Sequence, residues 1–187
     1  MEFSCVKDCS QCCIEREYYP SKKFGKIGVL VMPDEKKHLE LLARENNLDV
    51  TILPRIGISY DIAETPTEII AYQMMGKEEN GNTCPFLDTE TNARSPHGGF
   101  LCKIYDKRPL ACKAYPLEET NPITLDSKCK FCQNNGNTAS NMVEEAEALI
   151  KIKVKMSTHA PNIWRYATGI GDIDHADQIK KGWFMES

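Results

Sequence analysis

The sequence lacks any long hydrophobic run. No stretch of about 18 apolar residues is present, so the sequence excludes a membrane-spanning helix. The N-terminal residues MEFSCVKDCSQCC also lack the apolar core of a secretory signal peptide. Basic residues are not in excess, since 23 Lys and Arg stand against 27 Asp and Glu, for a net charge of −4. We therefore expect a cytoplasmic protein without a membrane contact, and the charge disfavours nucleic acid as a partner.

The common catalytic signatures are missing as well. The chain has no Walker loop and no GxGxxG, HExxH or GxSxG motif. Histidine is scarce, and His38, His159 and His175 have no cysteine beside them. Only His97, in the turn SPHGG, is a candidate metal ligand, although a polar turn residue is the simpler interpretation. Whether the protein is an enzyme, and which protein or small molecule is its partner, does not follow from the sequence.

The residue that the chain has in excess is cysteine, and its nine cysteines fall into two groups. The 70 residues from 14 to 83 contain none and separate the groups. In a reducing compartment, such cysteines are more often metal ligands than disulfides. The spacing predicts that both groups meet around bound metal and that the chain between them is scaffold. The predicted ligands are Cys5, Cys9, Cys12 and Cys13 of the first group and Cys84, Cys102, Cys112, Cys129 and Cys132 of the second.

The first group has the spacing C-x3-C-x2-C-C, which lets one tight loop aim several thiolates at one point. Iron–sulfur clusters are commonly held by such loops. Adjacent cysteines such as Cys12 and Cys13 usually diverge, so one can face a metal while the other packs or faces a second metal. Radical S-adenosylmethionine enzymes share the three-cysteine spacing. We disfavour that class because Gln11 replaces the usual aromatic residue and the short chain shows no βα repeat.

The second group ends in the C-x2-C pair Cys129 and Cys132, which is half of a four-thiolate zinc site. A thiolate centre carries negative charge that cations near the sulfurs can offset. Lysines adjoin three of these cysteines, and they are Lys103, Lys113, Lys128 and Lys130. The alternative is that these lysines are simply solvated.

Periodicity predicts a small antiparallel sheet. The β-rich runs are residues 24–32, 50–53, 56–60 and 68–75, with Pro54 separating the second run from the third. Turn-rich segments follow at 78–82 and 88–99. We expect an antiparallel β meander with cysteines at strand ends and turns, because a rigid sheet fixes the direction of such side chains.

Three helices are also expected. Pro33 starts the first, with acidic residues in its first turn and an end near Asn46. Arg108-Pro109 starts a short helix that carries Cys112. Ser140 caps a long helix from Asn141 to about Ser157, although residues 150–156 alternate like a strand.

The 187 residues suffice for one compact α+β domain, 1–187, organised around a Cys-ligated metal centre. It comprises the Cys-rich segments 5–13 and 84–132 and a C-terminal helix and tail, 140–187. The aromatic residues of the tail are expected to pack the end of the chain onto this domain.

The segments CVKDCSQCC, CPFLD and CKIYDKRPLACKAYP resemble a family of cysteine-cluster proteins labelled zinc- or iron-chelating (YkgJ-type). The family pattern has arginine where this chain has Lys113. The resemblance implies a metal or iron–sulfur centre in a small α+β protein. It would be carried by Cys5, Cys9, Cys12, Cys13, Cys84, Cys102 and Cys112. A flagellin lysine methylase has a similar cysteine arrangement, but the chain shows no glycine-rich loop for a methyl donor.

Three hypotheses follow. The first is a protein with a [4Fe–4S] cluster in a redox or catalytic role. The second is an interaction module stabilised by one or two Zn²⁺ ions. The third is a protein-modifying enzyme similar to the methylase. If two four-ligand sites exist, they use eight of the nine cysteines, and one of Cys12 and Cys13 is the spare.

Overall fold

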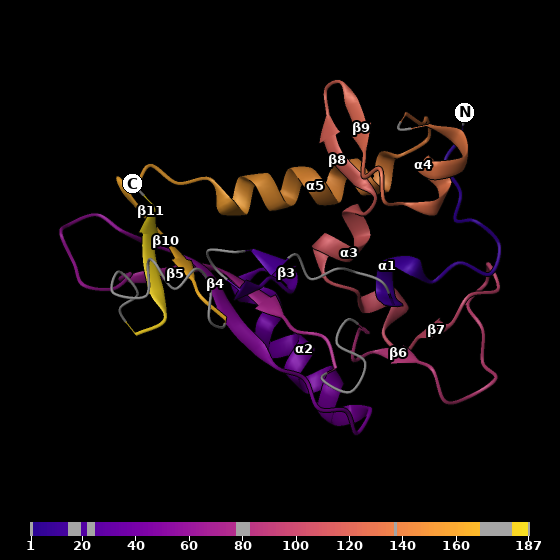
Figure 1. Cartoon of the computed structure of the whole chain (residues 1–187), viewed down its shortest axis with the longest axis horizontal. Helices are drawn as coiled ribbons and strands as arrows, with labels where there is room; N and C mark the ends of the chain where they lie inside the picture. The colour runs from indigo at the N-terminus through magenta and orange to yellow at the C-terminus, as the bar shows by residue number, and fades with distance from the viewer. Residues whose placement is uncertain are drawn as a thin grey trace.

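The largest sheet in the described residues has five antiparallel strands in the order β11-β10-β4-β5-β3 (Figure 1). Its strands are β3 (Val29–Val31), β4 (Ile52–Ser59), β5 (Glu68–Met74), β10 (Asn162–Tyr166) and β11 (Trp183–Glu186). The structure is a computed structural model that describes residues 2–14, 20–21, 25–77, 83–136, 138–168 and 181–186. The predicted turn at 78–82 and His175 lie outside these residues.

The cysteines lie on short elements and loops beside this sheet. The short helices are α1 (Gln11–Ile14), the 3-10 helix η2 (Tyr105–Lys107), α3 (Leu110–Ala114) and α4 (Lys130–Asn135). Three small hairpins pair β1 (Pro20–Ser21) with β2 (Gly25–Lys26), β6 (Leu87–Asp88) with β7 (Leu101–Cys102), and β8 (Leu117–Thr120) with β9 (Ile123–Leu125). The α+β class and the antiparallel pairing are as predicted, whereas the cysteines lie outside the main sheet.

Two long helices, α2 (Pro33–Glu45) and α5 (Val143–Met156), cover opposite faces of the sheet (Figure 1). Side chains alternate between the faces of a strand. Val29 and Val31 therefore pack with Leu39 of α2, in what we call the sheet–α2 cluster. Leu30 points the other way and packs in the sheet–α5 cluster with Ile152.

Helix α2 forms where the sequence predicts it. Pro33 occupies its first turn, and Leu39, Leu42 and Ala43 form the buried stripe. The Glu35 side chain caps the start of the helix, because its Oε2 accepts a 2.9 Å hydrogen bond from the backbone N–H of Met32.

Strand β4 is continuous through Pro54, so the prediction of two separate strands is wrong. A register shift between Pro54 and Ile56 accommodates the proline. The buried amide of Gln73 donates from Nε2 to the Pro54 carbonyl at 2.9 Å and accepts from the Gly28 N–H at 2.8 Å. The side chain thereby satisfies backbone groups that regular strand pairing leaves free.

The second half of α5 is helical, so the strand alternative for residues 150–156 is wrong. Ala148 and Ile152 are buried at helical spacing. Ser140 is not the cap, because the helix starts at Val143 with Met142 before it. The Ser140 carbonyl instead accepts a hydrogen bond from the Phe3 N–H.

The aromatic residues of the tail pack onto the domain, as expected, and three of them are buried while Tyr166 is half-buried. Trp164 lies in β10, and Trp183 and Phe184 lie in β11, two strands that the sequence did not predict. Trp164 Nε1 donates a 3.1 Å hydrogen bond to Ser59 Oγ of β4, which ties the tail to the centre of the sheet.

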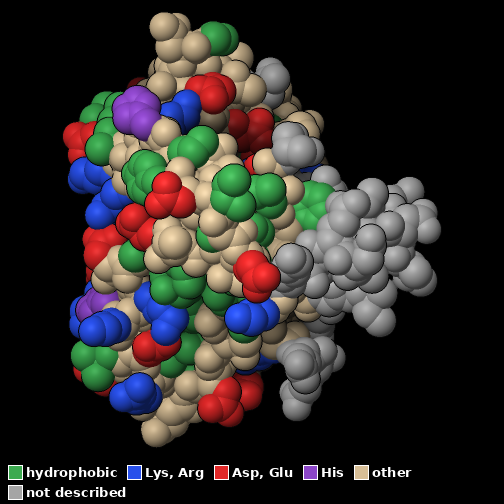
Figure 2. All heavy atoms as spheres, turned by 90° about the vertical axis from the view of Figure 1, so that its left-hand side faces the viewer, with side chains coloured by type: hydrophobic (Ala, Val, Ile, Leu, Met, Phe, Trp, Pro, Cys, Tyr) green, Lys and Arg blue, Asp and Glu red, His purple; other side chains and the backbone are tan. Residues whose placement is uncertain are grey.

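Figure 2 shows the face at the left-hand side of Figure 1, with hydrophobic side chains in the middle and charged ones around them. Both charge signs occur on this face. Within the described residues, no helix combines the length and the apolar character needed to cross a membrane.

Candidate metal centre

The N-terminal cysteine segment lies against the second cysteine group. The Cys84 N–H donates a 2.8 Å hydrogen bond to the Cys13 carbonyl oxygen. Figure 1 shows the indigo N-terminal segment passing α4 and reaching α1 beside α3. The structure therefore brings together two groups that 70 cysteine-free residues separate in the sequence.

Two consecutive turns shape the N-terminal cysteine segment. The Cys9 N–H donates to the Val6 carbonyl at 3.0 Å, and Asp8 takes the left-handed backbone conformation, with φ of 60°, that closes this turn. Helix α1 follows, carrying Cys12 and Cys13, whose sulfurs are 3.8 Å apart. These turns fold four cysteines into a compact loop.

The turn around His97 holds this loop in place. The His97 carbonyl accepts from the Asp8 N–H at 2.9 Å, and His97 Nε2 lies 3.2 Å from the Cys9 carbonyl oxygen. The Ser10 hydroxyl accepts from the Phe100 N–H at 2.7 Å. A Cβ on Gly99 would overlap the Cys9 carbonyl oxygen, so this close approach requires glycine. The candidate ligand His97 thus contacts the cysteine backbone through its ring.

Three cysteines of the second group pack against the sheet–α2 cluster. They are the half-buried Cys84, Cys102 and Cys112, which lie beside the fully buried core residues Phe86 and Ile104. Burial raises the pKa of the Cys102 thiol, and the N–H of Ile104 partly offsets this by a hydrogen bond. We call these three residues and Cys13, which adjoins Cys84, the inner cysteines.

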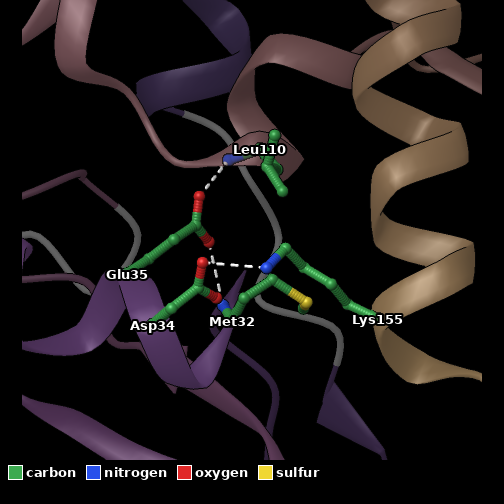
Figure 3. A network of polar contacts seen from close by, with 5 residues as sticks. All are labelled: Met32, Asp34, Glu35, Leu110 and Lys155. Carbon is green, nitrogen blue, oxygen red and sulfur yellow. Dashed lines mark hydrogen bonds and ion pairs between the residues drawn. The ribbon is translucent and has the colours of Figure 1, made fainter.

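Glu35 positions the helix that carries Cys112, as Figure 3 shows. One carboxylate oxygen caps α2 at Met32, and the other accepts a 2.7 Å hydrogen bond from the Leu110 N–H, the first residue of α3. Beside it, Lys155 of α5 pairs with Asp34 at 2.8 Å. The sequence did not reveal this role of Glu35, because its second acceptor contact joins residues 75 positions apart.

Cys129 and Cys132 lie in a different part of the core. Cys129 is the N-cap of α4, and Cys132 is a buried residue of the helix. Both pack with Phe3 and Val6 in what we call the β8–α4 cluster. Burial, together with the charge and the hydrogen bond of Cys129, raises the pKa of Cys132 to about 12.

The thiols of the two groups are near enough to influence one another electrostatically. Surrounding protein atoms raise the pKa of Cys5 to about 11, although the residue is exposed overall, and the charges of Cys12, Cys9 and Cys129 contribute. The hydrogen bond between the sulfurs of Cys12 and Cys13 holds the pKa of Cys13 far above its usual range, and burial and the charges of Cys12, Cys84 and Cys112 add to this effect. Uncharged thiols are favoured until a cation replaces their protons.

The charge of Arg108 reaches both cysteine groups. It opposes the raised pKa values of Cys5 and Cys102. Its guanidinium lies 3.8 Å from the centre of the Tyr105 ring, and its Nε donates to the Tyr105 carbonyl at 2.7 Å. The predicted candidates were Lys103, Lys113, Lys128 and Lys130, all of which are exposed. In the sequence, the pair Arg108-Pro109 indicated only the start of a short helix and not a charge near the cysteines.

The donor chemistry fits zinc or iron, because thiolates are the soft ligands that Zn²⁺ and iron–sulfur clusters select. All nine cysteines are free thiols. Among the described residues, no three His, Cys, Asp or Glu side chains already stand in an arrangement that could hold an ion. Coordination therefore requires the sulfurs to turn toward a common point, as rotation about χ1 allows.

The fold and the gathered thiols define a cysteine-rich domain of the α+β class. The model of the CxxCxxCC family, described as "Putative zinc- or iron-chelating domain", matches residues 4–133. The chain belongs to this family, which supports metal binding with zinc or iron as the metal. The match includes both cysteine groups. Searches of curated proteins and of solved structures gave no significant match.

Proposed function

We propose that the protein binds a [4Fe–4S] cluster through its cysteines and serves in a redox or catalytic reaction. The contact between Cys13 and Cys84 supports this proposal most strongly. It brings an iron–sulfur type of loop, C-x3-C-x2-C, next to Cys84, Cys102 and Cys112 on short, well-packed elements. Four thiolates are the usual ligand set of a cubane cluster.

The inner cysteines are the ligands that fit this cluster. When bound by four thiolates, the cluster would supply one-electron chemistry. Phe86 and Ile104 exclude water from one side of these sulfurs, because both are almost fully buried. Arg108 and the Ile104 N–H stabilise negative charge on sulfur.

The same chemistry supports a cytoplasmic location. Nine free thiols persist where the surroundings are reducing. A cluster that depends on them is retained under the same conditions.

Anaerobic purification followed by iron, sulfide and zinc analysis tests the function. We expect brown protein with about four iron and four sulfide ions per chain. Colourless protein that contains only zinc would support the zinc-stabilised interaction module instead. A titration with S-adenosylmethionine separates both from a methylase, since only the methylase should bind it.

A further inference from the structure

Cys129 and Cys132 do not share the packing of Cys84, Cys102 and Cys112. The latter three contact the sheet–α2 cluster, whereas the C-x2-C pair contacts the β8–α4 cluster. The two sets of sulfurs therefore lie against separate parts of the hydrophobic core.

The N-terminus is fixed next to the C-x2-C pair. The Phe3 N–H donates to the Ser140 carbonyl at 3.3 Å and to Asn141 Oδ1 at 2.9 Å. The Phe3 ring meets the Phe131 ring of α4 edge to face, with centroids 5.1 Å apart. Cys5 follows Phe3 by two residues, and Val6 packs in the same cluster as Cys129.

The two members of each cysteine pair, Cys5 with Cys9 and Cys129 with Cys132, lie close together along the chain. The turn closed by the Cys9 N–H and the Val6 carbonyl draws Cys9 back toward Cys5. Cys129 and Cys132 are three residues apart at the start of α4, a spacing that places two side chains on one side of a helix.

We propose that Cys5, Cys9, Cys129 and Cys132 form a second site, which binds one Zn²⁺ separately from the inner cysteines. The spacings C-x3-C and C-x2-C lie within the range of structural zinc sites, which are closed by four thiolates. Four bound thiolates release four protons on zinc binding. The ion fixes the N-terminal segment to α4. Cys12 lies between the two sites and is a ligand of neither. The proposal rests on the proposed function only for the use of the inner cysteines.

Metal analysis of matched cysteine variants tests the second site. The full-length protein is purified anaerobically in the wild-type form and as Cys5→Ser, Cys129→Ser and, as an inner control, Cys102→Ser. Iron and zinc per chain are measured together with the visible absorbance and the far-ultraviolet circular dichroism. Cys5 is exposed, so its substitution keeps the fold even if the packed Cys129 does not tolerate serine.

We expect about one zinc per chain in the wild type, bound to four sulfurs at about 2.3 Å in X-ray absorption. Loss of an outer-shell contact alone lowers metal affinity about 10- to 100-fold, so loss of a ligand should lower zinc affinity at least as much and reduce the zinc retained per chain. Cys5→Ser and Cys129→Ser should keep iron and absorbance, whereas Cys102→Ser should lose both and keep zinc.

Three results would overturn the second site. They are a wild type without zinc, zinc that is unchanged in Cys5→Ser, and zinc and iron that fall together in that variant. A wild type that holds two zinc ions and no iron would contradict the [4Fe–4S] proposal instead. In that case Cys5→Ser and Cys102→Ser should each lose one of the two ions, and the second site would stand.

Discussion

The Cys84 N–H donates a 2.8 Å hydrogen bond to the carbonyl oxygen of Cys13. The chain between these residues forms α2 and the β4–β5 hairpin, which build the surface that the inner cysteines pack against. The scaffold and the metal centre therefore depend on each other. Substitutions in the scaffold should change metal retention even where they lie far from any sulfur in the sequence.

Glu35→Ala should lower both stability and metal retention. The substitution removes the acceptors of the Met32 and Leu110 N–H groups, and hydrogen bonds to charged groups contribute about 1.5–3 kcal/mol each. We expect a loss of roughly 2–4 kcal/mol in the free energy of unfolding, measured by urea denaturation.

Glu40→Ala is the matched control. Glu40 lies on the same helix, is also half-buried and makes one ion pair, with Lys36 at 2.6 Å. Such a helix-surface pair contributes about 0.2–0.5 kcal/mol. Equal losses for the two variants would show that Glu35 does not position α3.

Gly99→Ala should displace the N-terminal cysteine segment. The new Cβ would overlap the Cys9 carbonyl oxygen and the Ser10 hydroxyl, and overpacking of this kind costs roughly 1–3 kcal/mol. Metal content should fall with stability. Gly136→Ala is the control, since its φ of 85° disfavours alanine but its Cβ would meet no atom within 4 Å. The idea fails if Gly136→Ala lowers metal content as much as Gly99→Ala.

Metal-free and metal-loaded protein should respond to pH in opposite directions. Burial first, and neighbouring thiols second, raise the pKa of Cys5 from 9.0 to about 11. The folded metal-free protein therefore favours the neutral thiol. The contribution of this preference to the free energy of unfolding is complete below pH 9.0 and is lost as the pH rises through about 11. Metal binding requires thiolates, so metal loading should weaken as the pH falls. Thermal melts of both forms between pH 6 and 11 would measure this, and parallel curves would contradict it.

Arg108→Ala should make metal loading require a higher pH. Arg108 lowers the pKa values of Cys5 and Cys102, so its removal lets both rise further. Arg108→Lys keeps the charge and loses the planar contact with Tyr105, so its loading should lie nearer the wild type. Zinc titrations of the reduced wild type and both variants at several pH values would show which protein needs the higher pH for zinc loading. An unchanged pH dependence in Arg108→Ala would exclude the electrostatic role.

Local signals allowed α2 and α5 to be predicted. Pro33, the acidic first turn and the apolar stripe of α2 act within a few residues, and the charges of α5 run from acidic to basic along the helix. The cysteine spacing likewise predicted that the two groups meet, and the hydrogen bond between Cys84 and Cys13 joins them, whereas which sulfurs share a metal stays a prediction.

Long-range contacts account for what the sequence did not show. The continuity of β4 depends on the side chain of Gln73, which no local rule assigns to Pro54. Strand β10 forms because Trp164 and its neighbours pair with β4, which lies far away in the sequence, and β11 then pairs with β10. Local preference predicted that Ser140 caps a helix. In the structure its carbonyl oxygen instead accepts a hydrogen bond from the Phe3 N–H of the N-terminal segment.

Residue-by-residue alkylation of the native, metal-loaded protein tests the shared metal ligation of the two cysteine groups most directly. Peptide mapping after brief iodoacetamide treatment should show eight cysteines protected, with Cys12 alkylated, and all nine alkylated after the metal is removed under denaturing conditions. If cysteines of either group other than Cys12 react in the native, metal-loaded protein as fast as in the denatured chain, the two groups do not converge on bound metal.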